Sequence, residues 1–323
     1  MNLLITGGTG FLGKSLLKEL IENKDFGHIY ILAQQGSLKK ISHLSLDGRF
    51  VILQGNLISL PSFPSQIDVV IHAAARGSRF DKKSGFDRVN RQGTQNLTEA
   101  LKNHKVKKFI YISSNMANKK NPDAYGISKK ESEEIVSYWA KSEGADFYIL
   151  RSSMIYGPES RPNSGITQFV DDALSGKGIY LKIDWPGECC LIYVDDYAKI
   201  ILSMVSSHTP SGIYGISDGN IYRLGMVFSK ILEVCKIKSP LFKLPDAAWK
   251  GILAVSSIVF KGARYHQIAS LLGKELKVDD PLFNSILTDS RMTSLEDGLF
   301  SVYRWLQSKS GKIRDEEIVY HRS

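Results

Sequence analysis

Short apolar runs alternate with longer amphipathic stretches through the first half of the chain. The amphipathic stretches, in which apolar side chains recur at helical spacing, cover residues 16–22, about 86–102 and about 123–143. The apolar runs are each short enough for one buried strand and lie at residues 2–5, 28–33, 50–53, 68–72, 108–113 and 146–151. Strands that alternate with helices in this way predict an α/β protein with a Rossmann-type doubly wound parallel sheet.

The pattern changes after Pro158, where proline, glycine and serine separate shorter elements. Helical spacing returns at residues 195–206 and 224–235. We therefore expect a smaller second lobe made of about 158–187 together with 218–323. The larger domain would comprise residues 1–157 and about 188–217.

The composition is that of an ordinary globular protein, since 43% of the 323 residues are hydrophobic and 23% are charged. This balance excludes a disordered or fibrous chain. The formal net charge of +9 is compatible with nucleic acid, an acidic membrane surface or small ligands that carry phosphate. The basic residues are scattered, however, and form no clustered face with aromatic residues, so we expect no nucleic-acid partner.

The chain shows little sign of a membrane segment or a metal site. Its longest apolar stretch, residues 252–260, is too short to cross a bilayer, so we expect no stable membrane insertion. We interpret it as a buried or lid helix, with attachment to a membrane surface as the alternative. The three cysteines, Cys189, Cys190 and Cys235, have neither metal nor disulfide spacing, so no metal site is predicted. Because no leader pattern follows Met1, we expect a cytoplasmic location.

A glycine-rich turn follows the first apolar run directly. In Thr6-Gly7-Gly8-Thr9-Gly10-Phe11-Leu12-Gly13, Gly7 allows a tight reversal, Gly10 lets backbone N–H groups approach a pyrophosphate, and Gly13 lets the following helix pack closely. Because a strand precedes the turn and a helix follows it, the pattern predicts a dinucleotide-binding site.

A possible acid–base pair lies further along the chain. Tyr125 and Lys129 are four residues apart, so on a helix both side chains project from one face. A lysine ammonium nearby stabilises a phenolate and lowers the pKa of a tyrosine, which brings proton transfer into range. Ser114, at the end of the fifth predicted strand, can donate a hydrogen bond to the same substrate oxygen. Parallel sheets bind ligands at these carboxyl ends.

With these motifs the chain resembles the extended short-chain dehydrogenases/reductases, in the NAD-dependent epimerase/dehydratase branch that includes nucleotide-sugar epimerases, dehydratases and 4-ketoreductases. The resemblance covers nearly the whole chain. Its carriers are residues 6–13, 70–75, 89–90, 93–97, 111–114, 125–129, 150–151, 156–158 and 193–196.

The resemblance implies that the larger domain binds NAD or NADP and that the smaller lobe binds substrate. Tyr125 would be the acid–base catalyst, Lys129 would bind the nicotinamide ribose and tune Tyr125, and Ser114 would polarise the substrate carbonyl. Asn90 would support the active-site strands. Asp195 and Asp196 are interpreted instead as a helix N-cap with a first-turn acid. The implied cofactor-binding residues are Gly7, Gly10, Phe11, Leu12, Gly13, Gln34, Asn56, Leu57, Ala73, Ala74, Ala75, Asn90, Tyr125 and Lys129.

The chain departs from the family pattern at the cofactor site. Gln34 stands where relatives often have an acid for the adenosine ribose or an arginine for its 2′-phosphate, so the choice between NAD and NADP is open. Ser37, Lys39 and Lys40 are either a phosphate site or an exposed loop. Asn56 replaces the usual adenine-binding aspartate and can still pair through its amide.

The substrate site departs as well. Ser114 and Tyr125 are only 11 residues apart, where many relatives insert a longer loop. Met154 occupies the place of an asparagine that contacts substrate in some epimerases. Cys190 lies near a position where relatives often have an arginine that contacts the nucleotide diphosphate. Arg161 or Lys182 could supply that positive charge instead, and the alternative for each is a surface role.

The resemblance leaves several functions open. The favoured prediction is reduction of a 4-keto-6-deoxy nucleotide sugar, because the short Ser114 to Tyr125 connection and Met154 suit 4-ketoreductases. A nucleotide-sugar 4-epimerase with retained NAD is the first alternative. Reduction of a non-sugar carbonyl and a non-catalytic dinucleotide sensor are the others. The resemblance further suggests surface polysaccharide biosynthesis and a homodimer that pairs through the helices at about 86–102 and 123–143.

Overall fold

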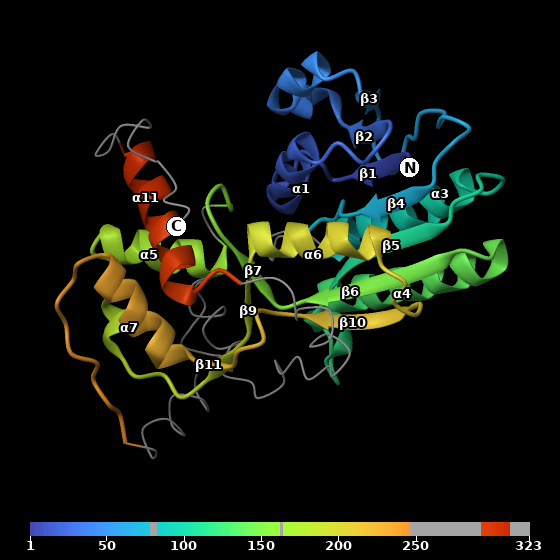
Figure 1. The fold of residues 1–323 in the computed structure, drawn as a ribbon. Helices are drawn as coiled ribbons and strands as arrows, with labels where there is room; N and C mark the ends of the chain where they lie inside the picture. Colours follow the sequence, from blue (N-terminus) through green and yellow to red (C-terminus); the bar gives the residue numbers. More distant parts are fainter. Residues whose placement is uncertain (78–82, 162–163, 246–291, 311–323) are drawn as a thin grey trace. The chain divides into compact units, whose positions relative to one another are not determined.

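The computed structural model describes residues 1–77, 83–161, 164–245 and 292–310. These residues form two compact units (Figure 1). The first contains residues 1–153 and 194–216, and the described part of the second contains residues 154–193, 217–245 and 292–310. The stretch at 252–260 lies outside the described residues. Among the helices that are described, none combines the length and hydropathy that crossing a membrane requires.

A sheet of seven parallel strands forms the centre of the first unit, in the order β10-β6-β5-β4-β1-β2-β3. The predicted doubly wound parallel sheet is thereby confirmed. The edge strand β10 was not among the strands predicted from the sequence. The chain order reverses between β1 and β4, which is the switch point at which such sheets bind ligands. The strands are β1 (Leu3–Thr6), β2 (Ile29–Ala33), β3 (Phe50–Gln54), β4 (Val69–His72), β5 (Lys108–Ser114), β6 (Asp146–Ser152) and β10 (Gly212–Ile216).

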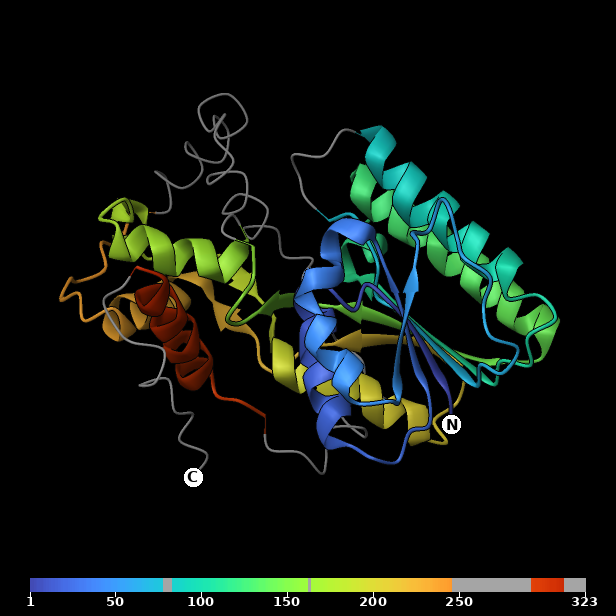
Figure 2. The ribbon, with the colours of Figure 1, turned by 90° about the horizontal axis from the view of Figure 1, so that it is seen from above.

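Helices cover both faces of this sheet (Figure 2). The helices α1 (Phe11–Glu22) and α6 (Val194–Ser206) pack together on one face. On the other face, α3 (Gly93–Ala100) and α4 (Ala124–Glu143) bury a core that includes Leu97, Trp139 and Phe109 of β5. The α4 helix is fixed at its start because the Asp123 carboxylate accepts a hydrogen bond from the Gly126 N–H at 2.9 Å.

The single helix expected at about 86–102 is three segments instead. A short helix α2 (Lys83–Phe86) leads into a π-helical segment η3 (Asp87–Gln92), which continues into α3. A π-helix contains an extra residue per turn and shifts the side chains that follow. Asn90 and Thr94 are both buried as a result.

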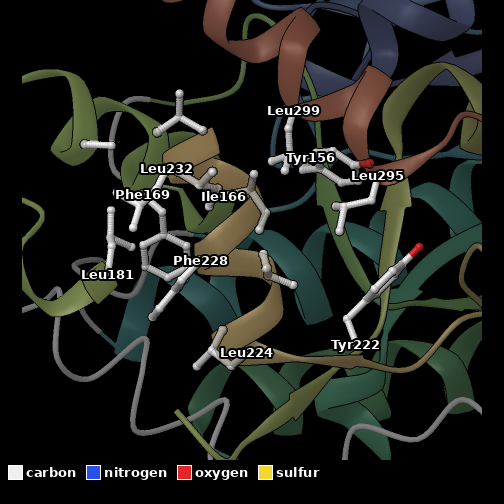
Figure 3. Close-up of a cluster of buried hydrophobic side chains, with 14 of the residues drawn as sticks. Tyr156, Ile166, Phe169, Leu181, Tyr222, Leu224, Phe228, Leu232, Leu295 and Leu299 are labelled. Carbon is white, nitrogen blue, oxygen red and sulfur yellow. The ribbon is translucent and has the colours of Figure 1, made fainter. Parts of the chain in front are cut away.

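Helices α5 (Gly165–Leu174), α7 (Leu224–Val234) and α11 (Leu295–Lys309) enclose the core of the second unit (Figure 3). The rings of Phe169 and Phe228 lie at its centre, 5.1 Å apart and edge to face. Two small sheets pair β7 (Met154–Tyr156) with β9 (Leu191–Tyr193) and β8 (Glu188–Cys189) with β11 (Tyr222–Arg223). Short 3₁₀ segments are η1 (Gln35–Lys40), η2 (Ser42–Leu46), η4 (Asn115–Asn118) and η5 (Ile179–Lys182).

Candidate functional site

The glycine-rich turn joins β1 to α1 in a close-packed arrangement. Gly7 has a φ of 78°, and a Cβ at this position would lie 2.5 Å from the Ala74 nitrogen. A Cβ at Gly13 would collide with the Gly7 carbonyl oxygen. Both positions therefore require glycine. The α1 helix begins at Phe11 with no acidic residue in its first turn, so its N-terminal N–H groups form a site suited to an anion.

A chain of hydrogen bonds fixes the loop that passes beside this turn. Thr94 Oγ1 donates to the Asn90 carbonyl and therefore accepts from His72 Nε2 at 3.0 Å. The other ring nitrogen, Nδ1, then accepts from Thr6 Oγ1 at 2.6 Å, and Thr6 Oγ1 accepts from the Ala74 N–H at 3.2 Å. The partners thus assign His72 as the Nε2–H tautomer. Burial, with a smaller effect of the Lys129 charge, lowers the pKa of His72 to about 3.

Asn90 supports the same loop from the opposite side. Its Oδ1 accepts from the Arg76 N–H at 2.8 Å, and its Nδ2 donates to the Arg76 carbonyl at 3.1 Å and to Ser128 Oγ at 2.9 Å. Because Ser128 belongs to α4, the buried Asn90 amide connects the loop after β4 to the helix that carries Tyr125 and Lys129. These contacts make Asn90 a positioning residue.

Tyr125 and Ser114 interact at the carboxyl end of β5. Burial raises the pKa of Tyr125 to about 12, and a hydrogen bond with the Ser114 side chain acts in the opposite direction. The expected lowering of this pKa by Lys129 is not found in the structure. The phenol is therefore held in its protonated form, which can donate a proton.

Lys129 is almost fully buried, with 2% of its surface exposed. Its ammonium donates to the Ile112 carbonyl at 2.6 Å and to the Tyr111 hydroxyl at 3.2 Å, and it lies 4.6 Å from the centre of the Tyr111 ring. Burial lowers the pKa of Lys129 to about 7, although the Glu133 carboxylate acts to raise it. The charge on Lys129 therefore changes near neutral pH.

A buried ion pair lies one helical turn beyond Lys129. Arg151 Nη2 is 2.6 Å from Glu133 Oε2, and Arg151 Nε is 3.0 Å from Glu133 Oε1. Ser113 Oγ donates to the same carboxylate, and Arg151 Nη1 donates to Asn118 Oδ1 at 2.9 Å. The pair therefore connects α4 to Ser113, directly before Ser114, and to Asn118, which follows Ser114 on η4.

A cavity of about 1290 Å³ opens beside the ends of β2 and β3. Asn56 forms part of its wall, where its side-chain oxygen accepts from the Ile58 and Ser59 N–H groups at 2.9 and 3.0 Å. Leu57 is buried behind it, and its carbonyl accepts from Asn96. The lining residues are Gln34, Gln35, Gly36, Gln54, Gly55, Asn56, Ile58, Ser59, Leu60, Pro61, Arg76, Gly85, Arg88 and Val89.

The two predicted substrate residues belong to the second unit. Met154 lies on β7, where its N–H donates to the Cys190 carbonyl at 3.3 Å. Arg161 is exposed, and its carbonyl accepts from the Ser164 N–H at 3.0 Å. In the first unit, α6 begins at Val194, so Asp195 and Asp196 both lie in its first turn and Asp195 is not the N-cap that the sequence suggested. The Asp195 carboxylate accepts from Ser15 Oγ of α1 at 2.5 Å, which is a structural role.

Sequence analysis did not identify the supporting roles of His72, Thr94, Glu133 and Arg151. The spacing from Lys129 to Glu133 is the same four residues that separate Tyr125 from Lys129, so it could have indicated that Glu133 faces the sheet. Arg76 and Arg88 were missed because the cavity that they line is completed by residues 34–36 and 54–61, which lie far from them along the chain.

Comparison with known proteins gives consistent matches. The model of the NAD dependent epimerase/dehydratase family matches residues 3–217. An uncharacterized UDP-glucose epimerase of Bacillus subtilis is 27% identical over 64% of this chain and 72% of its own length. A dTDP-D-glucose 4,6-dehydratase of Dictyostelium discoideum is 28% identical over 72% of the chain, which spans 60% of that protein. The structure of UDP-glucuronic acid 4-epimerase from Bacillus cereus in complex with NAD superposes with a TM-score of 0.75, at 20% identity over 98% of this chain and 99% of that one.

Proposed function

Because the chain belongs to the NAD-dependent epimerase/dehydratase family of extended short-chain dehydrogenases/reductases, we propose that it is an oxidoreductase that reduces a 4-keto-6-deoxy nucleotide sugar. The observation that carries this proposal is the hydrogen bond between Tyr125 of α4 and Ser114, which lies at the end of β5 in the sheet that also bears the glycine turn. With a pKa of about 12, the Tyr125 hydroxyl carries its proton at neutral pH, and the reductive direction requires this protonation state.

The residues of the first unit fit a dinucleotide. In the glycine turn there is no space for a side chain at Gly7 or at Gly13. The N-terminus of α1 beside them can bind a pyrophosphate. The cavity at Gln34 and Asn56 would take the adenosine, with Leu57 behind it. We assign Phe11, Leu12 and Ala73, Ala74 and Ala75 to the path of the phosphates and ribose.

A reduced nicotinamide held by the glycine turn and Lys129 would supply the hydride that the ketone carbon requires. Ser114 donates a hydrogen bond to the carbonyl oxygen, and Tyr125 transfers its phenolic proton to that oxygen. The ammonium of Lys129 would hold the cofactor in place for this transfer. Two of its N–H groups are engaged by Ile112 and Tyr111, and we assign the third to the cofactor ribose.

The second unit would bind the nucleotide sugar through Met154 and Arg161, with Lys182 as an alternative cation for the diphosphate. A homodimer through α3 and α4 is supported by the exposed apolar side chains of α4, since Ile127 and Tyr138 are 46% and 79% exposed. Light scattering on the protein and on a Tyr138→Lys variant tests this arrangement. A monomeric wild-type protein would contradict it.

The second candidate is a nucleotide-sugar 4-epimerase, which is favoured by the names of the relatives. Mass spectrometry of dinucleotide released from denatured, freshly purified protein separates the two. A reductase exchanges its cofactor at each turnover, so reversible binding of added dinucleotide is expected. Stoichiometric retained NAD would favour the epimerase, and a protein that binds no dinucleotide would contradict both.

A further inference from the structure

Two arginines are the charged residues among the described residues that line the cavity beside β2 and β3. They are Arg76, from the loop after β4, and Arg88, from η3. Asp87, which neighbours Arg88, is paired with Arg91 at 2.5 Å and lies outside the described lining. The two arginines therefore offer positive charge to a ligand in the cavity.

The two arginines and Gln34 line the same cavity. The Arg76 side chain runs along Gly85, because a Cβ at Gly85 would lie 3.4 Å from both its Cδ and its Nε. Both arginines are exposed. The Arg76 backbone is fixed by the Asn90 amide through both its N–H and its carbonyl. The base of this side chain is thus held in place, which reduces the entropy lost on binding a ligand.

We propose that this cavity binds the 2′-phosphate of the adenosine ribose, so that the chain prefers NADP(H) to NAD(H). This inference rests on the proposed function, because it assigns the adenosine half of the same dinucleotide. A phosphate monoester carries about −1.5 to −2 charges at pH 7, and arginine binds it through two parallel hydrogen bonds. The ribose of NAD offers a neutral hydroxyl at the same place.

Gln34 is compatible with this assignment. It lies at the start of η1 directly after β2, where a carboxylate would bind the ribose hydroxyls of NAD and repel a phosphate. The amide carries no charge and can donate to a phosphate oxygen. Ser37, Lys39 and Lys40, the phosphate site considered from sequence, lie on η1 outside the cavity lining. The structure thus assigns the phosphate to Arg76 and Arg88.

Calorimetric titration of the full chain with NADPH and with NADH tests the proposal without turnover. NADPH is expected to bind roughly ten- to hundredfold more tightly than NADH, because its 2′-phosphate adds charge-assisted hydrogen bonds to the arginines. Arg88→Ala and Arg76→Ala should each weaken NADPH binding about tenfold and leave NADH binding unchanged. Gln34→Asp should weaken NADPH and strengthen NADH. Arg91→Ala is the matched control, because it removes a neighbouring arginine that is paired with Asp87.

Equal or tighter binding of NADH by the wild-type protein would overturn this proposal and leave the proposed function standing. A preference for NADPH that survives both arginine variants and is lost in a Lys39→Ala/Lys40→Ala variant would overturn the assignment to this cavity. Failure to bind either dinucleotide would remove the proposed function as well. Circular dichroism of each variant identifies loss of binding that comes from unfolding.

Discussion

The guanidinium of Arg151 binds the buried carboxylate of Glu133 through two nitrogens, with Nη2 at 2.6 Å and Nε at 3.0 Å from its oxygens. Glu133 is 4% exposed, so neither water nor salt screens the pair strongly. The pair connects α4, which carries Tyr125 and Lys129, to β6 and, through Ser113, to β5. It therefore sets the distance between Ser114 and Tyr125.

Removing one partner of this pair should lower the free energy of unfolding by several kcal/mol. Arg151→Met leaves the Glu133 carboxylate buried without its cation, which typically costs about 3–5 kcal/mol. Urea unfolding measures the loss. The matched control is Arg91→Met, which breaks the more exposed pair with Asp87 and should cost less than about 1 kcal/mol. Equal losses for the two variants would show that the buried pair has no special role.

The reductive reaction should slow as the pH rises through the pKa of Lys129. Below about pH 7 the ammonium of Lys129 is charged and can hold the cofactor ribose. Above that pH its loss should lower kcat/KM, by up to about tenfold per pH unit. The groups around it are Glu133, which favours the charge, neutral His72, and the protonated Tyr111 and Tyr125.

Lys129→Arg is the control for this profile, because a guanidinium stays charged at every working pH. Its kcat/KM should be lower overall but independent of pH across the same range. An alkaline limb of the same midpoint in both enzymes would assign the titration to another group.

His72 should make the fold sensitive to acid. Its pKa is about 3 in the folded chain against 6.5 in the ordinary state. The unfolded chain therefore binds more protons between these values, and stability is lost as the pH falls from about 6.5 to about 3. His72→Phe should be less stable at neutral pH, since Thr6 and Thr94 lose their partner, but should lose less stability over that range. Parallel pH curves for the two proteins would contradict the assignment.

The tautomer of His72 gives an independent check. ¹⁵N NMR of the imidazole should show a protonated Nε2 and an unprotonated Nδ1 at neutral pH. Thr94→Val removes the acceptor of Nε2–H and should disturb this signal, whereas Thr98→Val, on the same helix and bonded only locally to the Gln95 carbonyl, should not.

The sequence contained enough information to predict the sheet and the helix that carries Tyr125 and Lys129. Each of the first six strands is a compact apolar run, and the spacing of Tyr125 and Lys129 gave their shared helix. β10 was missed because Gly-Ile-Tyr-Gly-Ile contains two glycines, which favour turns over strands. The π-helical segment at Asn90 was missed because it depends on the buried hydrogen bonds that Asn90 makes. The pKa of Tyr125 was predicted in the wrong direction, because desolvation is set by packing that spacing does not reveal.

The proposed reaction is hydride transfer from an exchangeable reduced dinucleotide to a sugar ketone, with Tyr125 as the proton donor. It is tested by mixing the protein with a 4-keto-6-deoxy nucleotide sugar and a reduced dinucleotide that carries deuterium at the transferred position of the nicotinamide. We expect that one dinucleotide is oxidised for each sugar reduced and that the deuterium appears at C4 of the sugar. The Tyr125→Phe variant should slow this reaction about 10²- to 10⁴-fold and still bind the dinucleotide. Interconversion of C4 epimers with no net oxidation of dinucleotide, or equal rates for wild-type and Tyr125→Phe proteins, would contradict it.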